Sequence, residues 1–131
     1  MSLLIGKHIV LALSTPAIKA LIGDRVYPLV IPDGTPRYPF IVYKRLGISP
    51  DYTKDGRGED NCNVQISIIS KTYEDAINIA NAVRYELESV AADYLEFTVN
   101  TAKVAGSDEE YIDGVDAYCE TLIFDFRTND K

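Results

Sequence analysis

The clearest pattern along the chain is the alternation of apolar and polar residues over residues 61–70. Its apolar members are Cys62, Val64, Ile66 and Ile68. A period of two predicts a β-strand with one buried face and one face that is partly wet. Residues 38–47 show a similar pattern, in which Phe40, Val42 and Leu46 share one face. We expect these two segments to pair as antiparallel strands.

Helical spacing of apolar residues runs through residues 72–90. Its apolar positions are Tyr73, Ala76, Ile77, Ala80, Val83, Leu87 and Val90. Thr72 precedes Asp75 by three residues, a relation similar to a capping box, so an amphipathic helix is predicted to begin there. Shorter helices are expected over about 3–13 and from Pro16 to Gly23.

Three further strands are expected at about 25–31, 94–104 and 116–127. The first belongs at a sheet edge or a bulge because Pro28 has no N–H group. The order α-β-β-β-α-β-β predicts an α+β fold, with a single antiparallel sheet of four to five strands and helices packed on one face. A length of 131 residues suits one domain over 1–131.

Charge and cysteine content reduce the number of possible functions and locations. Thirteen Lys and Arg against twenty Asp and Glu give a net charge of −7, which argues against gripping nucleic acid through its phosphates. Two cysteines, neither in a C-x-x-C pair, form no disulfide framework, and a reducing cytoplasm is expected. The apolar stretch near the N-terminus is interrupted at Gly6, Lys7 and His8, so neither a secretory leader nor a membrane span is expected.

Candidate chemistry is sparse. Residues 51–56 resemble the start of a calcium loop, but Thr53 and Cys62 stand where ligands belong. An acidic loop from Gly106 to Gly114 lacks a nucleophile–base pair, and the only histidine, His8, is expected at the surface or its boundary. Cys62 and Cys119 fall in strand patterns and are expected to be buried. We predict no catalytic, cofactor-binding or metal-binding residues.

A connection over about residues 48–60 is far longer than a hairpin needs. Such a long polar hairpin loop is typical of an interaction arm. Its residues include types that are common at protein interfaces. The candidate interface residues are Asp51, Tyr52, Lys54 and Arg57.

Several segments, taken in order, resemble a known family. They are Ile22-Gly-Asp-Arg-Val-Tyr-Pro28, Tyr38-Pro-Phe-Ile-Val-Tyr43, Thr72-Tyr-Glu-Asp-Ala76, Ala82-Val-Arg84 with Leu87, and the segment that ends at Tyr118. Over about residues 3–127 the chain resembles the tail-completion proteins of tailed bacteriophages and prophages, which are similar to the tail-terminator group of the lambda minor tail protein U.

This resemblance implies a structural virion assembly protein without enzymatic activity or cofactor. Copies of the chain would form a ring, commonly of six, that caps the tail tube and joins it to the head. The implied partners are the chain itself, the tail-tube protein and head/neck connector proteins. DNA would pass through without specific binding, and no membrane is involved. The implied location is the host cytoplasm during assembly and then the tail or neck of the virion.

Two other interpretations remain open at this stage. A small α+β ligand-binding domain or enzyme could use the acidic loop, 106–116, with His8 or Arg25. The other interpretation is an adaptor or antitoxin-like binding module that forms a one-to-one complex with a non-phage partner.

Overall fold

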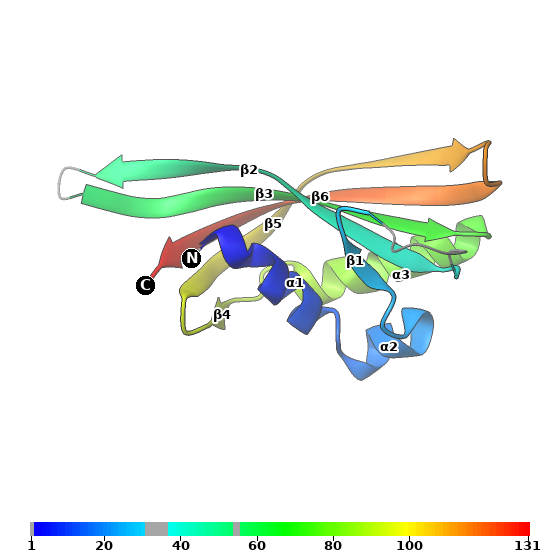
Figure 1. Cartoon of the computed structure of the whole chain (residues 1–131), viewed down its shortest axis with the longest axis horizontal. Helices are drawn as coiled ribbons and strands as arrows, with labels where there is room; N and C mark the ends of the chain where they lie inside the picture. The colour runs from blue at the N-terminus through cyan, green and yellow to red at the C-terminus, as the bar shows by residue number, and fades with distance from the viewer. Residues whose placement is uncertain (1, 31–36, 54–55) are drawn as a thin grey trace.

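The computed structural model describes residues 2–30, 37–53 and 56–131 (Figure 1). A 3-10 turn, η1 (Ser2–Leu4), precedes the helices α1 (Ile5–Ala12), α2 (Pro16–Ile22) and α3 (Tyr73–Leu87). The strands are β1 (Val26–Pro28), β2 (Phe40–Thr53), β3 (Gly56–Ser70), β4 (Ala92–Asp93), β5 (Phe97–Ile112) and β6 (Ala117–Asp130).

The six strands form one mixed sheet in the order β1-β2-β3-β6-β5-β4. β1 pairs with β2 in parallel, and every other neighbouring pair is antiparallel. The sheet twists and curls into a half-barrel (Figure 1). The prediction of a four- to five-stranded antiparallel sheet with helices packed on one face was therefore wrong. Long strands accumulate twist, and bulges such as those at Arg45/Gly47 and Val104/Gly106 bend them further.

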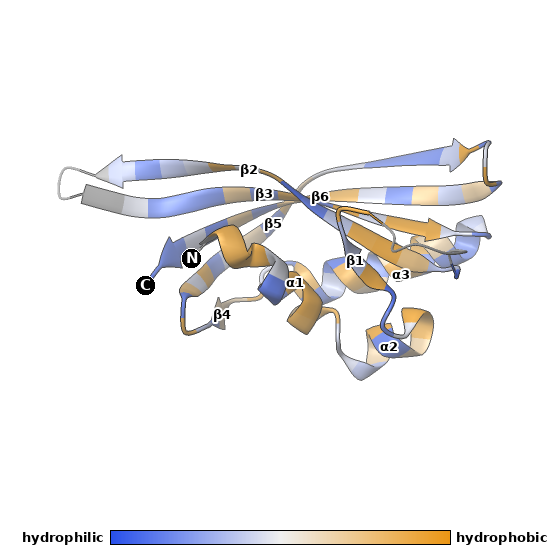
Figure 2. Ribbon diagram, viewed as in Figure 1, coloured by the Kyte–Doolittle hydropathy of each residue, from blue (hydrophilic) through white to orange (hydrophobic). Residues whose placement is uncertain are grey.

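The main core lies between the helices and the face of the sheet that we call the inner face. The strand residues with a period of two, including Val64 and Ile66 of β3 and Phe124 and Phe126 of β6, point into it. From the helices it receives Ile5, Ile9, Leu13, Ile18, Ile22, Ile79, Val83 and Leu87. Figure 2 shows the apolar residues concentrated in this core, whereas the part of the β2–β3 hairpin near its closed end is mainly polar.

The opposite, outer face of the sheet carries a smaller apolar cluster. Phe40, Ile69, Ala117 and Cys119 form its buried part. Both faces of β2 are thus apolar near its start, with Ile41 in the main core and Phe40 in the outer cluster. Leu46, which was expected to share a face with Phe40, lies at a bulge and is exposed. The expected burial of Cys62 and Cys119 is confirmed.

Two segments expected to be loops are mostly strand. Residues 48–53 end β2 and residues 56–60 begin β3, with 54–55 outside the described residues. In the acidic segment, β5 continues to Ile112, and a turn at 113–116 leads into β6. The closed ends of these two hairpins lie at opposite ends of the molecule (Figure 1). The expected loop Pro32–Pro36 lies outside the described residues.

The predicted start of α3 is confirmed: the hydroxyl oxygen of Thr72 accepts a hydrogen bond from the backbone N–H of Asp75 at 3.2 Å. The variant Thr72→Ala leaves that N–H without its side-chain partner. We expect it to lower the free energy of unfolding by about 1 kcal/mol. Urea unfolding followed by circular dichroism measures this change, and Thr72→Ser, which keeps the acceptor, should lie close to the original protein.

Candidate assembly surfaces

The candidate interface residues lie at the closed end of the β2–β3 hairpin. The backbones of Tyr52 and Arg57 are direct partners across the two strands. The Tyr52 side chain is 74% exposed, which leaves it free to contact another molecule. Lys54 lies outside the described residues. The structure thus brings Asp51, Tyr52 and Arg57 together at one projecting end of the sheet (Figure 1).

Asp51 also has a partner within the chain. The Arg127 guanidinium on β6 donates a hydrogen bond from Nη1 to Oδ2 of Asp51 at 2.8 Å, reaching across β3. Nearby, the amide of Asn100 on β5 donates to the carboxylate of Glu59 on β3 at 2.8 Å. These two exposed contacts link the hairpin to β6 and β5. Asp51 therefore contributes an intramolecular contact that holds the hairpin against β6.

Carboxylates crowd together on the other hairpin. Glu109 of β5 and Glu120 of β6 are direct cross-strand partners on the inner face. The hydroxyl of Tyr73, at the start of α3, donates a hydrogen bond to Glu109 Oε2 at 2.9 Å. Glu120 is only 9% exposed. Burial, together with the neighbouring carboxylates of Glu109 and Asp108, raises the pKa of Glu120 to about 7.

Three tyrosines surround this carboxylate pair. The ring of Tyr118 lies 5.7 Å from that of Tyr73 and 5.1 Å from that of Tyr111, both edge-to-face. Together with the glutamates they line a hollow of about 280 Å³. Glu109 was expected in a solvated loop but lies in β5. The sequence pattern that could have predicted a strand here is the alternation of Glu109 and Tyr111, on one face, with Glu110 on the other.

Removing the charge of Glu120 should stabilise the protein at alkaline pH. Because the pKa of Glu120 is higher in the folded chain, the folded state holds more protons between about pH 4.5 and 7. This contribution is present below pH 4.5 and is lost as the pH rises through 7. We expect Glu120→Gln to raise the melting temperature at pH 8 and to change it little at pH 4.5. Glu110→Gln, on the exposed outer face, is the control, and equal shifts for both variants would contradict this.

His8 differs from its prediction as a residue at the surface or its boundary: it is 2% exposed. Its Nδ1 lies 2.7 Å from the hydroxyl oxygen of Tyr94, and its ring packs edge-on against Phe126. Nε2 is buried without a partner in the described part of the chain. Burial lowers the pKa of His8 to about 4, so the ring is neutral at pH 7. The spacing of His8 from Ile5 and Ile9 could have predicted its burial, since these three residues share the buried face of α1.

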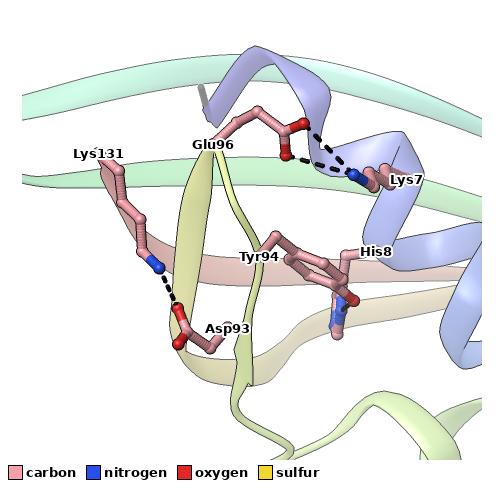
Figure 3. Close-up of polar contacts among 6 residues, drawn as sticks. All are labelled: Lys7, His8, Asp93, Tyr94, Glu96 and Lys131. Carbon is pink, nitrogen blue, oxygen red and sulfur yellow. Dashed lines mark hydrogen bonds and ion pairs between the residues drawn. The ribbon is translucent and has the colours of Figure 1, made fainter.

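Ion pairs hold the segment between β4 and β5 over His8. Lys7 of α1 pairs with Glu96 at 3.2 Å, and Lys131 at the C-terminal end pairs with Asp93 (Figure 3). The Lys7 ammonium also lies 5.7 Å from the centre of the Tyr94 ring. These residues enclose the imidazole of His8. The contacts of His8 are therefore packing contacts within the core, which indicates a structural role.

The structure does not assemble the enzyme site that was considered from the sequence. His8 contacts Tyr94 and Phe126 in the core, whereas Arg25 donates a hydrogen bond to the carbonyl of Pro39 at 2.9 Å. The acidic residues lie on the β5–β6 hairpin among tyrosines. Within residues 2–30, 37–53 and 56–131, no three His, Cys, Asp or Glu side chains are grouped to hold a metal ion.

No single helix in the described ranges has the length and apolarity to cross a membrane. The pair Ile5–Ala12 and Pro16–Ile22 reaches the required length and composition only when both are taken together, across an 85° bend.

Comparison with known proteins decides the family. The sequence model of the family "Tail completion protein gp17" matches residues 8–116. The chain belongs to this family. As a tail completion protein it is a structural component of phage tail assembly, associated with the tail or neck of the virion. The comparison with curated protein sequences gave no match.

A solved structure has the same fold. It is a chain of the "Virion of native gene transfer agent (GTA) particle", with a TM-score of 0.82 and 17% sequence identity. The alignment covers 94% of this tail completion protein and 92% of that chain. The family match extends from His8 in α1 to the turn after β5, so it includes the whole β2–β3 hairpin.

Proposed function

We propose that this chain caps the phage tail tube as a ring of identical copies and joins the tail to the head. The family match over residues 8–116 carries the proposal. The resemblance to tail-terminator proteins suggests six copies, with the tail-tube protein and the head/neck connector proteins as further partners. The protein would be made in the host cytoplasm and would act without catalysis, by shape and adhesion.

The shape and charge of the chain support this role. The closed ends of its two hairpins lie at opposite ends of the sheet, so each copy can contact a different partner at each end. Six copies would carry 6 × (−7) = −42 formal charges. A negatively charged ring repels phosphates, which lets DNA pass without being held.

The direct test is a phage or prophage that lacks this gene. We expect it to make tails of irregular, excessive length and heads without tails, seen by negative-stain electron microscopy. Supplying the intact chain from a plasmid should restore joined particles. Tails of normal length that are joined to heads in the absence of the gene would contradict the proposal.

A matched pair of tyrosine variants tests the β2–β3 hairpin as the contact region. Tyr52, on the hairpin, is 74% exposed, and Tyr85, on α3, is 83% exposed. Because neither ring is buried, each change to Ala should leave the melting temperature nearly unchanged. In the complementation assay we expect Tyr52→Ala to lower the yield of joined particles about tenfold, and Tyr85→Ala to leave it unchanged. Equal yields for the two variants would exclude Tyr52 from the contact.

A further inference from the structure

Two long strand edges of the sheet lack a neighbouring strand in the described residues. β1 pairs with β2 only at Ile41–Tyr43, and β4 pairs with β5 only at Thr98–Val99. Beyond these short strands, residues 44–53 of β2 and 100–112 of β5 have no strand on their outer side within the ranges that the structure describes. We call them the β2 edge and the β5 edge. On the β5 edge the carbonyl of Ala102 already accepts a hydrogen bond from the backbone N–H of Ser89 at 2.9 Å. The rest of each edge presents backbone N–H and C=O groups that another strand can pair with.

The directions of the strands make these edges compatible. β2, β3, β6 and β5 lie side by side and alternate in direction, so β2 and β5 run antiparallel. A second copy related by rotation about an axis close to the strand direction would therefore place its β2 antiparallel to β5 of the first. The alternation of the sheet would continue from one copy into the next.

The two edges carry opposite charge. The β2 edge has Lys44 and Arg45 near its start, and Lys44 makes no ion pair within the described residues. The β5 edge has three consecutive acids, Asp108, Glu109 and Glu110. Two β2 edges would repel each other, as would two β5 edges, whereas a β2 edge attracts a β5 edge.

The side chains also lie on matching faces. Lys44 follows Phe40 and Val42 on the outer face of β2, opposite Gln65. Glu110 lies opposite Cys119, which belongs to the outer cluster, so it shares that face. In a sheet that continued across two copies, Lys44 and Glu110 would lie on the same side and within reach of each other.

There is room at the point where each short edge strand ends. A hollow of about 400 Å³ lies between the N-terminal residues Leu3–Lys7 and Tyr43 and Arg45 of β2, where β1 stops at Pro28. A hollow of about 500 Å³ lies beside Val99 and Asn100, where β4 stops. Bulges at Arg45/Gly47 and Val104/Gly106 interrupt both edges, which limits pairing with unrelated strands.

We propose that the β2 edge of one copy pairs antiparallel with the β5 edge of the next, so that the sheets of neighbouring copies become continuous. The proposal rests on the proposed ring. Each copy uses two different surfaces, which is the type of contact that closes into a ring when the rotation between copies allows it.

Chemical cross-linking distinguishes this contact from a symmetrical one. In an antiparallel pair, moving five residues forward from Lys44 corresponds to moving five residues back from Glu110. If Lys44 lies opposite Glu110, Ser49 therefore lies close to Ala105, and both Ser49 and Ala105 are exposed. We expect the variant with Ser49→Cys and Ala105→Cys, treated with a short bismaleimide, to give a ladder of covalent multimers. Each single variant should give no ladder, and the unchanged protein, whose cysteines are both buried, is the blank. Dimers from a single variant, with nothing larger from the double one, would overturn the proposal.

Charge reversal provides a second test of the same contact. We expect Lys44→Glu or Glu110→Lys alone to weaken assembly about tenfold, measured by light scattering over a concentration series with and without purified tail tubes. Both changes in one chain should restore assembly to within about threefold of the unchanged protein. Lys19→Glu, which alters net charge equally but lies on α2, should assemble normally. Failure of the double change to restore assembly would count against the pairing.

The two proposals fail in different ways. If the unchanged protein assembles and caps tail tubes but the double cysteine variant gives no ladder, edge pairing is wrong and the capping function stands. If the ladder forms but tubes are not capped, the proposed function is wrong and the pairing stands. A protein that stays monomeric even with tail tubes would overturn both.

Discussion

Replacing residues 51–59 by Asn-Gly is expected to reduce tail joining strongly while the chain still folds. Pro50 and Asp60 are direct cross-strand partners, so a two-residue turn can connect them. The change removes all four candidate interface residues, Asp51, Tyr52, Lys54 and Arg57, at once. Loss of contacts worth about 2 kcal/mol would reduce the yield of joined particles about 30-fold. The measurement is complementation of a gene-deleted phage.

The same replacement should cost little stability. It removes the contacts of Asp51 with Arg127 and of Glu59 with Asn100, which are exposed and worth about 1 kcal/mol or less each. Three acids and two bases are deleted, so the net charge changes only from −7 to −6. We expect the melting temperature to fall by less than about 8 °C. Asp51→Asn, which weakens the ion pair alone, is the control and should still complement.

A collapse in melting temperature would mean that the hairpin end belongs to the folding unit. Normal yields from a well-folded shortened chain would instead remove this end of the hairpin from the assembly surface. The two readouts, stability and yield, therefore separate a folding defect from a lost contact.

The elements predicted correctly are those in which local spacing reports a buried face. The alternation through Val64 and Ile66 and the helical spacing after Thr72 each record burial on one side, and β3 and α3 follow from them. Helix α3 ends at Leu87, sooner than predicted, because Glu88 has an extended ψ of 129° and Ser89 then adopts a φ of 63°, neither of which a helix permits.

The strand ends were missed for the opposite reason. Residues 48–53 and 106–112 pair with the partner strand of their own hairpin, and the side chains of residues 48–52 and 106–112 are exposed or only partly buried. Polar hairpin ends carry little hydrophobic alternation, so their sequence resembles that of a loop. A bulge at Arg45/Gly47 also moved Leu46 out of the expected register.

Sheet topology and the candidate surfaces depend on contacts between distant segments. Nothing within Val26–Pro28 shows that this strand pairs in parallel with β2. The Arg127–Asp51 contact joins residues 76 positions apart, and the Glu109–Glu120 pair depends on the register of two strands. The pairing of β2 with β3 was predicted from the alternation of their residues, but the free edges became visible only in the assembled sheet.

The buried imidazole should make the protein sensitive to acid. His8 has a pKa of about 4 in the folded chain and about 6.5 when unfolded, so the unfolded state binds more protons between these values. Stability due to the neutral ring is fully present above pH 6.5 and is lost as the pH falls toward 4. From pH 7 to pH 5 this loss is about 2 kcal/mol in the free energy of unfolding.

Glu120 opposes this loss in the same pH range. Its raised pKa makes the folded state more stable as the pH falls from 7 toward 4.5, so the two effects partly cancel in the unchanged protein. Glu120→Gln removes the compensation. Urea unfolding of this variant at pH 7, 6 and 5 should therefore reveal the full loss due to His8.

Adding His8→Phe to Glu120→Gln isolates the imidazole. Phenylalanine can still pack against Phe126 but does not titrate, and the Tyr94 hydroxyl loses its partner, at a cost of about 1 kcal/mol at pH 7. The double variant should start lower at pH 7 and change about 2 kcal/mol less on acidification than Glu120→Gln alone. Parallel pH dependence in the two variants would mean that the pKa of His8 is nearly the same in the folded and unfolded chain, and so that burial does not keep its ring neutral. Their divergence would instead establish a neutral, buried His8 as the residue that limits stability in mild acid.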